Sequence, residues 1–258
     1  MAPENPTLTA RAAERALHGF ALDLRWSWNH ATDPLWRQIN PECWEHTQNP
    51  WTTLNNASRA HLNALLNKPA FRREVGHAMA AQAEGLRHPT WFAQKHDASA
   101  LSCIAYFSME YMLSEALPIY SGGLGNVAGD QPKAASDPGV PVVAVGLLFA
   151  QGYFRQELTP AGQQHALYPF NDPSLLPISP VLTKEGDVLR IPIRFARGHV
   201  WIRAWKATVG RATLYLLDTN DPANPPGVRS VTPQLYGGDP DLRPVPYTHL
   251  TLPTNTEV

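Results

Sequence analysis

The sequence is poor in cysteine, in net charge and in long apolar runs, and each shortage excludes a class of protein. Only two of its 258 residues are cysteine, Cys43 and Cys103, whose spacing indicates neither a disulfide framework nor a metal site, so we expect no metal and a reducing cytoplasm. The formal net charge of −1 offers no basic surface for nucleic acid or an anionic membrane. No stretch approaches the ~18 apolar residues of a membrane span, and the first thirty residues contain no continuous apolar segment, so we expect a protein that is neither exported nor membrane-spanning.

What the sequence does contain, from its start, is helical periodicity. Apolar residues recur at spacings of three and four, which predicts one amphipathic helix through Leu17, Phe20, Leu24 and Trp28. Asp33 followed by Pro34 predicts the capped start of a short second helix. Further helical segments are expected over residues 60–66 and 71–86, and the polar run 94–99 marks a boundary, so residues 1–97 are expected to form a helical region.

Five tryptophans lie between Trp26 and Trp51. Their rings could form a surface that stacks on sugars, or they could fill a small helical core. Because Trp28, Trp36 and Trp44 repeat every eight residues on helical stretches, we favour the core.

Beyond residue 97 the pattern changes to mixed α/β. Apolar runs at 101–107 and 142–149 flank a predicted helix at 124–137, and this order predicts a βαβ unit and a parallel sheet. Three later runs, at 189–195, 200–209 and 213–217, predict an antiparallel meander attached to that sheet.

A glycine-rich stretch just before the probable helix is the strongest chemical signal. Gly122, Gly123 and Gly125 let backbone amides approach an anion, and the helix would present its positive N-terminal end to the same charge. The alternative is a strand-to-helix turn with only a packing role. Glu110 follows an apolar strand and is expected at the carboxyl edge of the sheet, either facing a ligand or as a solvated or salt-bridged carboxylate.

Several stretches resemble one family, the short bacterial and archaeal α-glucan (glycogen/maltodextrin) phosphorylases. They are Tyr106-Phe-Ser-Met-Glu110, the glycine stretch, Gly152-Tyr-Phe-Arg-Gln156 and, nearer the N-terminus, Arg25-Trp-Ser-Trp-Asn29. The resemblance implies a helical N-terminal extension, residues 1–97, and an incomplete Rossmann-like N-terminal domain of a two-domain GT-B glycosyltransferase, residues 98–243. It also implies pyridoxal phosphate as cofactor, with α-1,4-glucan and inorganic phosphate as substrates and α-D-glucose 1-phosphate as product.

The resemblance also assigns site residues. The backbone of Gly122, Gly123 and Leu124 would lie beside the cofactor phosphate and the transferred glucosyl unit, and Glu110 would line the catalytic cleft. The resemblance thus implies Glu110 and Leu124 as catalytic residues and Gly122 and Gly123 as cofactor-binding ones. The cofactor lysine of this family belongs to its second domain, and the lysines here match no cofactor motif: Lys68, Lys95, Lys133, Lys184 and Lys206. We therefore predict that this chain alone has no phosphorylase activity.

Two segments depart from the family pattern. Where the family reads Gly-Asp-His-Leu-Lys, this chain has Gly129-Asp-Gln-Pro-Lys133, and Pro132 is expected to kink or shorten the helix. Residues 244–258, rich in Thr and Pro, resemble translated adaptor sequence, and we interpret them as a non-native tail rather than a flexible C-terminus.

Three other functions are compatible with parts of the sequence. Gly123-x-Gly125-x-x-Ala128 satisfies the bare dinucleotide pattern of a nicotinamide oxidoreductase, but neither a preceding strand nor a following acidic residue accompanies it. The other two are a glycogen-synthase-like glycosyltransferase fragment and a non-catalytic α-glucan-binding module. Oligomeric state is left open by the sequence.

Overall fold

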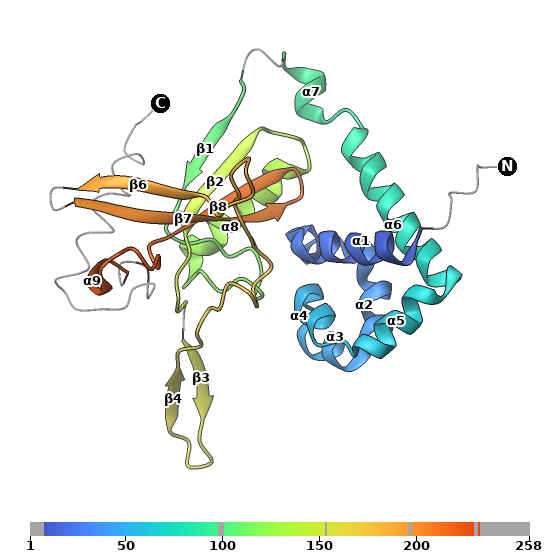
Figure 1. Cartoon of the computed structure of the whole chain (residues 1–258), viewed down its shortest axis with the longest axis horizontal. Coiled ribbons are helices and arrows are strands. Elements are labelled where there is room, and N and C mark those ends of the chain that lie inside the picture. The colour runs from blue at the N-terminus through green and yellow to red at the C-terminus, as the bar shows by residue number, and fades with distance from the viewer. Residues whose placement is uncertain (1–7, 98–100, 153, 196–197, 230–231, 233–258) are drawn as a thin grey trace. The chain divides into compact units, whose positions relative to one another are not determined.

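The computed structural model describes residues 8–97, 101–152, 154–195, 198–229 and 232 (Figure 1). Its contacts divide the chain into two compact units, Met1–Asp97 and Ala98–Val258, which we call the helical unit and the α/β unit. The segment interpreted as a non-native tail, residues 244–258, lies outside the described residues.

The helical unit consists of short helices joined by tight turns. Their bounds are α1 (Ala10–Leu22), η1 (Leu24–Ser27), η2 (His30–Thr32), α2 (Asp33–Ile39), α3 (Pro41–Thr47), α4 (Pro50–Asn55), α5 (Arg59–Asn67), α6 (Pro69–Arg87) and α7 (Trp91–Lys95). Proline occupies the start of α2, α3, α4 and α6, where its missing N–H costs nothing. The side chains of Asn40, Asn49 and Ser58 cap α3, α4 and α5 by accepting first-turn amides.

The first helix is shorter than its periodicity predicts. The prediction of one continuous helix as far as Trp28 was wrong, because α1 ends at Leu22 and the chain turns through the 3₁₀ segment η1. Asp23 causes the turn: its Oδ1 accepts the amide of Arg25 at 3.1 Å, which caps η1. The second helix was predicted with Asp33 as its cap, but Thr32 holds that position. Helices α4 and α7 were not predicted.

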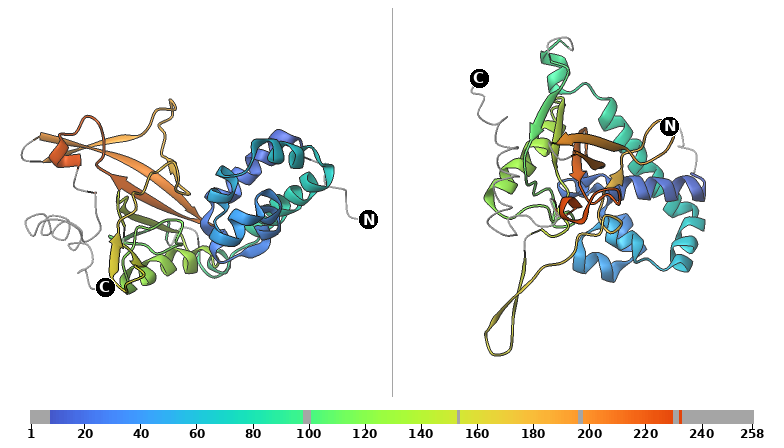
Figure 2. Two further views of the ribbon diagram at one scale, coloured as in Figure 1. Left: turned by 90° about the horizontal axis from the view of Figure 1, so that it is seen from below. Right: turned by 60° about the vertical axis from the view of Figure 1, so that its left-hand side comes forward.

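Tryptophan forms much of the core of this unit. Trp36 and Trp44 are 0% and 3% exposed, and they pack among leucine and phenylalanine side chains of α1, α2, α4, α5 and α6. Figure 2 shows these helices gathered around one interior. The core interpretation is confirmed for Trp36 and Trp44.

The α/β unit is built on a six-stranded mixed sheet with the order β1-β2-β8-β7-β5, in which β6 also pairs with β7. The strands are β1 (Ile104–Phe107), β2 (Val142–Leu147), β5 (Ser179–Pro180), β6 (Arg190–Phe195), β7 (Gly198–Val209) and β8 (Ala212–Asp218). Strands β1, β2 and β8 run parallel, and β6, β7 and β8 form an antiparallel meander. The predicted βαβ unit and meander are both confirmed, with α8 (Gly123–Ser136) between β1 and β2.

Helix α8 packs on the sheet against β2, β7 and β8. It runs through Pro132 to Ser136, so of the two predicted effects of Pro132 the shortening does not occur, and the kink stays a prediction. Pro132 is buried, and its packing offsets the single helix hydrogen bond that its ring removes.

The remaining elements lie outside the main sheet. Strands β3 (Arg155–Leu158) and β4 (Gln164–Leu167) form a separate two-stranded hairpin, which projects away from the sheet in Figures 1 and 2 and was not predicted. A single helical turn, α9 (Pro226–Arg229), follows β8. Within the described residues, no helix combines the length and the apolar character that crossing a membrane requires.

Candidate functional site

The candidate site lies where β1 ends and α8 begins. Glu110 follows β1 by three residues, and its side chain is only 4% exposed. Its Oε2 accepts the backbone amide of Ser121 at 2.7 Å and that of Gly122 at 3.4 Å. The structure therefore brings together two residues that the sequence analysis selected separately, the acidic residue and the first loop glycine.

This contact decides what Glu110 can do. A buried carboxylate that accepts loop amides holds the loop in place, and its negative charge lies at the positive end of α8. The next amides, of residues 123–125, belong to the first helical turn, where an α-helix leaves its N–H groups without intrahelical acceptors. Those amides are the donors that the site offers to an anion.

Glycines around this site fall into two groups. A Cβ placed on Gly125 would lie 2.8 Å from Cβ of Tyr120 and 2.9 Å from Oε2 of Glu110, and one on Gly129 would lie 2.1 Å from the carbonyl oxygen of Met112. Packing requires glycine at both positions. A Cβ on Gly122 or Gly123 would meet nothing within 4 Å, and neither residue has a positive φ. Neither packing nor backbone conformation requires glycine there.

Leu124 is the most exposed large apolar side chain at the site. It is 75% exposed at the start of α8, and Val127, one turn further on, is 61% exposed. Together they give the open glycines an apolar border.

Asn171, which no sequence pattern indicates, shapes the start of the loop. Asn171 is 5% exposed, and its Nδ2 donates to the carbonyl oxygens of Pro118 at 3.2 Å and Phe149 at 2.9 Å. The carbonyl oxygen of Pro118 also approaches Gly152, where a Cβ would lie 1.9 Å away. No sequence signal identifies Asn171, because its partners are backbone atoms 22 and 53 residues distant.

Tyr111 joins the parallel strands beneath the site. Its hydroxyl donates to the carbonyl oxygen of Tyr106 at 2.7 Å and lies 3.2 Å from that of Val145. Burial, with the nearby Tyr106 ring as a smaller contribution, raises the pKa of Tyr111 well above its usual value. The side chain therefore stays a neutral hydrogen-bond donor and serves as a structural tie.

The lysine nearest in sequence to the loop does not reach it. Lys133 lies ten residues after Gly123 on α8, a separation of about 15 Å along a helix axis. Burial lowers the pKa of Lys133, and the charge of Asp130 opposes that shift. Asp130 precedes Lys133 by three residues on the same helix, and its electrostatic influence on Lys133 agrees with their being neighbours.

A separate cavity of about 560 Å³ lies beyond the carboxyl ends of β2 and β8. Arg203, Asp218 and Trp205 line it: Nη2 of Arg203 lies 2.5 Å from Oδ2 of Asp218, and its guanidinium carbon lies 5.7 Å from the Trp205 ring centroid. No motif in the sequence points to these residues, because they come from two different strands, β7 and β8.

Comparison with known proteins supplies a second line of argument. A family described as "Protein of unknown function (DUF3417)" matches residues 13–117. A glycogen phosphorylase of Mycobacterium tuberculosis (strain CDC 1551 / Oshkosh) is 40% identical over 246 residues, and a maltodextrin phosphorylase of Thermococcus litoralis is 39% identical over 220 residues. This chain is a homologue of the glycogen and maltodextrin phosphorylases. A glycogen phosphorylase of Aquifex aeolicus is 34% identical over 233 residues.

The match to these phosphorylases covers most of this chain but less than a third of each relative. It covers 92%, 84% and 89% of this chain, but only 28%, 26% and 32% of the three relatives. The chain thus corresponds to the N-terminal part of the phosphorylases it matches. The resemblance seen in the sequence is confirmed, and the phosphorylase names favour it over a synthase-like fragment.

Proposed function

We propose that this chain is the N-terminal part of a pyridoxal-phosphate-dependent α-glucan phosphorylase of the cytoplasm. The whole enzyme would cleave α-1,4-glucan with inorganic phosphate and release α-D-glucose 1-phosphate with retention of configuration. In this proposal residues 98–243 are the beginning of a Rossmann-like GT-B domain, residues 1–97 are its helical extension and residues 244–258 are non-native. The phosphorylase homologues and the parallel β1-α8-β2 unit support it.

The observation that carries the proposed site is the contrast between the two groups of glycines. Gly125 and Gly129 are explained by packing, whereas Gly122 and Gly123 leave open space before the first-turn amides of α8. A phosphate group can approach those amides only where no side chain intervenes. We assign Gly122 and Gly123 to the anion cradle, Leu124 to its apolar border, and Glu110 to positioning the loop.

The residues present fit one end of the cofactor. Open glycines at a helix N-terminus suit the 5′-phosphate of pyridoxal phosphate, whose role in this family is to relay a proton together with inorganic phosphate. The covalent lysine must come from outside this chain. The chain's own contribution is therefore to bind and orient phosphate groups and to exclude water with the apolar border.

Phosphate binding by the purified chain tests the cradle. We expect Gly123→Ala to weaken binding of inorganic phosphate by about fivefold or more, because a methyl group would occupy the open space above the amides. Gly227→Ala is the matched control, since a Cβ there also meets nothing within 4 Å. Equilibrium dialysis with labelled phosphate gives both affinities, and equal affinities would contradict the cradle.

A chimera tests the activity. The purified chain should release no glucose 1-phosphate from maltodextrin, and its release would overturn the prediction of inactivity. Residues 8–232 are then substituted for the matching segment of the 40% identical Mycobacterium tuberculosis phosphorylase. We expect phosphate-dependent release of glucose 1-phosphate by this chimera. A folded chimera that binds its cofactor yet lacks that activity would count against the phosphorylase proposal.

A further inference from the structure

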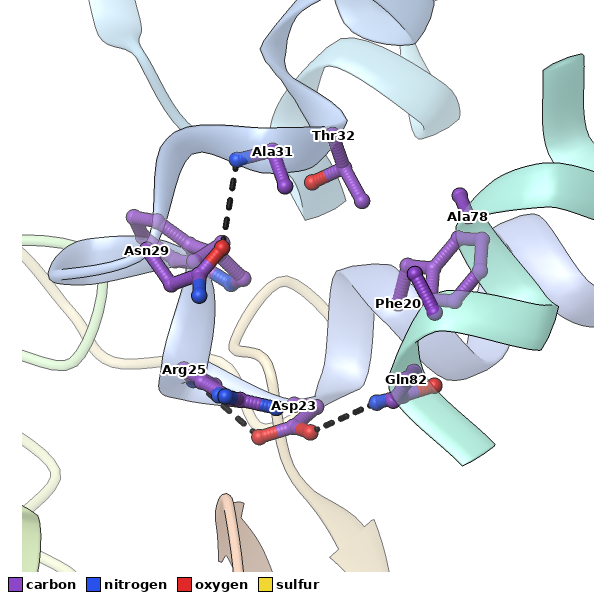
Figure 3. Close-up of a pocket in the computed structure, with 10 residues that line it drawn as sticks. Phe20, Asp23, Arg25, Asn29, Ala31, Thr32, Ala78 and Gln82 are labelled. Carbon is purple, nitrogen blue, oxygen red and sulfur yellow. Dashed lines mark hydrogen bonds between the residues drawn. The ribbon is translucent and has the colours of Figure 1, made fainter. Parts of the chain in front are cut away.

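The hairpin β3–β4 presents open backbone edges. Its two strands form a sheet of their own, so within the described residues each strand pairs with the other along one edge only. The outer edges carry N–H and C=O groups that no further strand in this part of the chain takes up. The helical unit differs: beside its cavity of about 130 Å³, the carboxylate of Asp23 accepts the amide of Arg25 and Nε2 of Gln82, both at 3.1 Å (Figure 3). These groups pair within the unit, whereas those at the hairpin edges are open to a partner.

The hairpin is also exposed on both faces. Every residue of β3 and of β4 is exposed, and the side chains of Leu158 and Leu167 are 72% and 42% exposed. Two strands alone are at best marginally stable in water, and an open edge strand is a template for pairing with another chain. Proteins block such edges with proline, lysine or a bulge. Strand β3 contains neither proline nor lysine, and its register with β4 is regular, so its edge is not blocked in these ways.

The hydrogen bonds of the hairpin determine which residues of β3 face outward. The amide of Thr159 donates to the carbonyl oxygen of Gln163 at 2.8 Å, so these two residues form a hydrogen-bonded pair next to the turn. Opposite pairs in an antiparallel ladder alternate between hydrogen-bonded and non-hydrogen-bonded. The pair Gln156–Ala166 is therefore of the second kind. The amide and carbonyl groups of Gln156, and by the same alternation those of Leu158, point away from β4.

The edge of β3 is complementary to itself. When the β3 strands of two copies pair antiparallel about a two-fold axis at Gln156, the two Gln156 residues exchange both of their outward backbone hydrogen bonds. The same register places Arg155 opposite Glu157 of the second copy, and Glu157 opposite Arg155 of that copy. These are non-hydrogen-bonded pairs, whose side chains lie closest together, and opposite charges at such positions stabilise a sheet.

The same register also joins apolar side chains. Alternate residues of a strand share a face, so Phe154, which precedes β3, lies on the same face as Gln156 and Leu158. Phe154 then comes opposite Leu158 of the second copy, while its ring centroid lies 6.1 Å from that of Tyr168 on its own hairpin. Pairing of two hairpins would thus cover the apolar side chain that is the most exposed on β3.

Other self-pairings of the hairpin fit less well. A two-fold axis at Leu158 would bring Pro160, which has no N–H group, into the ladder opposite Gln156. Pairing through the outer edge of β4 about Ala166 would place His165 opposite Leu167, without opposite charges. The edge of β3 centred on Gln156 is therefore the surface that the hairpin offers to a second copy.

We propose that two copies of this chain form a symmetric dimer in which their β3 strands pair antiparallel about Gln156. The two hairpins then make one four-stranded sheet, and the two-fold symmetry closes the assembly at two copies. The surface is small, so we expect a weak dimer with a dissociation constant of about 10–100 μM. The competing occupant of the edge is another part of the whole protein. The proposal does not rest on the proposed phosphorylase function.

Proline at the two-fold axis provides the test. Gln156→Pro removes the outward N–H group at the centre of the pairing, and proline is tolerated on an edge strand where the N–H faces solvent. Ala166→Pro is the matched control, because Ala166 lies opposite Gln156 and its N–H points outward from the other edge of the hairpin. We expect Gln156→Pro to weaken dimerisation by about tenfold or more and Ala166→Pro to leave it unchanged. Sedimentation of the full 258-residue chain at about 1–500 μM gives the dissociation constants.

Charge reversal examines the register without a change of backbone. Arg155→Glu and Glu157→Arg each place like charges opposite one another at two positions of the dimer, so each should weaken dimerisation by about threefold or more. The double variant Arg155→Glu/Glu157→Arg restores opposite charges across the axis and should recover the affinity of the unaltered chain. An equimolar mixture of the two single variants should likewise associate more tightly than either variant alone, because their charges are complementary.

The outcomes decide between a second copy and another occupant. A dimer that Gln156→Pro weakens and that the double charge reversal restores supports the pairing. A chain that sediments as a monomer up to about 500 μM would overturn the proposal and leave the edge to another part of the whole protein. Equal dissociation constants of Gln156→Pro and Ala166→Pro, or a double reversal no tighter than the single ones, would also overturn it. None of these results affects the phosphate titration of Gly123→Ala, on which the proposed function depends.

Discussion

Both units bury large apolar side chains, but the α/β unit leaves more of them exposed. The helical unit buries Trp36 and Trp44 almost completely, whereas the α/β unit leaves Leu124, Leu158 and Phe170 between 63% and 75% exposed. One unit therefore completes a core from its own residues, and the other keeps apolar surface around its candidate site and its hairpin. Exposed apolar surface of this kind is typical of regions that contact a ligand or another part of a protein.

The two units also differ in how far apart in the sequence their contacting residues lie. The helical unit is held by caps and turns between residues that are close in sequence, such as Asn40 with Cys43. The sheet pairs Ile104 with Val142 and Val143 with Thr213, across 38 and 70 residues. Local contacts form with a small loss of chain entropy, and distant ones with a larger loss. We therefore expect the helical unit to resist unfolding by denaturant better than the α/β unit does.

The largest effect on this difference between the units is expected from removing a side chain at the centre of the helical core. Trp36→Ala deletes a fully buried indole and its 3.1 Å hydrogen bond from Nε1 to Oγ1 of Thr32. We expect the free energy of unfolding to fall by about 3–5 kcal/mol. Denaturant titration followed by hydrogen exchange should place the loss in the helical unit.

Trp91→Ala is the control for that experiment. Trp91 is 55% exposed in the same unit, so its removal should change the free energy of unfolding by less than about 0.5 kcal/mol. Equal effects of Trp36→Ala and Trp91→Ala would show that the tryptophan core does not stabilise the unit.

A smaller effect is expected from a glycine of the α/β unit. Gly129→Ala would place a Cβ 2.1 Å from the carbonyl oxygen of Met112, so α8 must shift, at a cost of about 1–3 kcal/mol in the free energy of unfolding. Gly123→Ala, on the same helix with open space around it, should be neutral or slightly stabilising. Thermal unfolding of the two variants measures the difference, and its absence would contradict the division of the glycines into two groups.

The sequence predicts the α/β unit better than it predicts the helical one. Strand β2, helix α8 and the meander follow from apolar runs separated by Gly and Pro, and these signals are strong. In the helical unit, the periodicity of Leu17, Phe20 and Leu24 continues past the true end of α1, because Asp23 redirects the chain by capping the next turn. A side chain that hydrogen-bonds its own backbone does not alter hydrophobic periodicity, so the pattern could not show it.

The sequence predicts only part of the candidate site. Sequence selects Glu110 and the glycines as residue types, and the resemblance selects their family. Which glycines packing requires depends on Tyr120 and Met112, whose positions follow from tertiary structure. The same holds for Glu110, whose hydrogen bonds to the amides of residues 121 and 122 cross 11 and 12 positions.

The smallest expected effect on the difference between the units comes from lowering the pH. Asp221 is buried in the loop after β8, and Arg190 of β6 donates to both of its carboxylate oxygens, at 2.7 Å from Nε to Oδ2 and 2.5 Å from Nη2 to Oδ1. These bonds lower the pKa of Asp221 below its ordinary value of 3.8. Hydrogen bonds from Ser174 likewise lower the pKa of Asp172, which is in the same unit.

The sign of the pH effect follows from the lowered pKa. Below 3.8 the unfolded chain binds protons that folded Asp221 does not, so stability that is complete above this pH is lost as the pH falls further. We expect the denaturant midpoint for unfolding of the α/β unit to decrease as the pH is lowered from about 4 to about 2. The decrease should be smaller in Asp221→Asn. Asp187→Asn, at an exposed carboxylate of the same unit, should leave the pH dependence as it is. Hydrogen exchange at each pH assigns the loss to a unit, and a fall unchanged by Asp221→Asn would mean that the Arg190 ion pair does not stabilise the sheet.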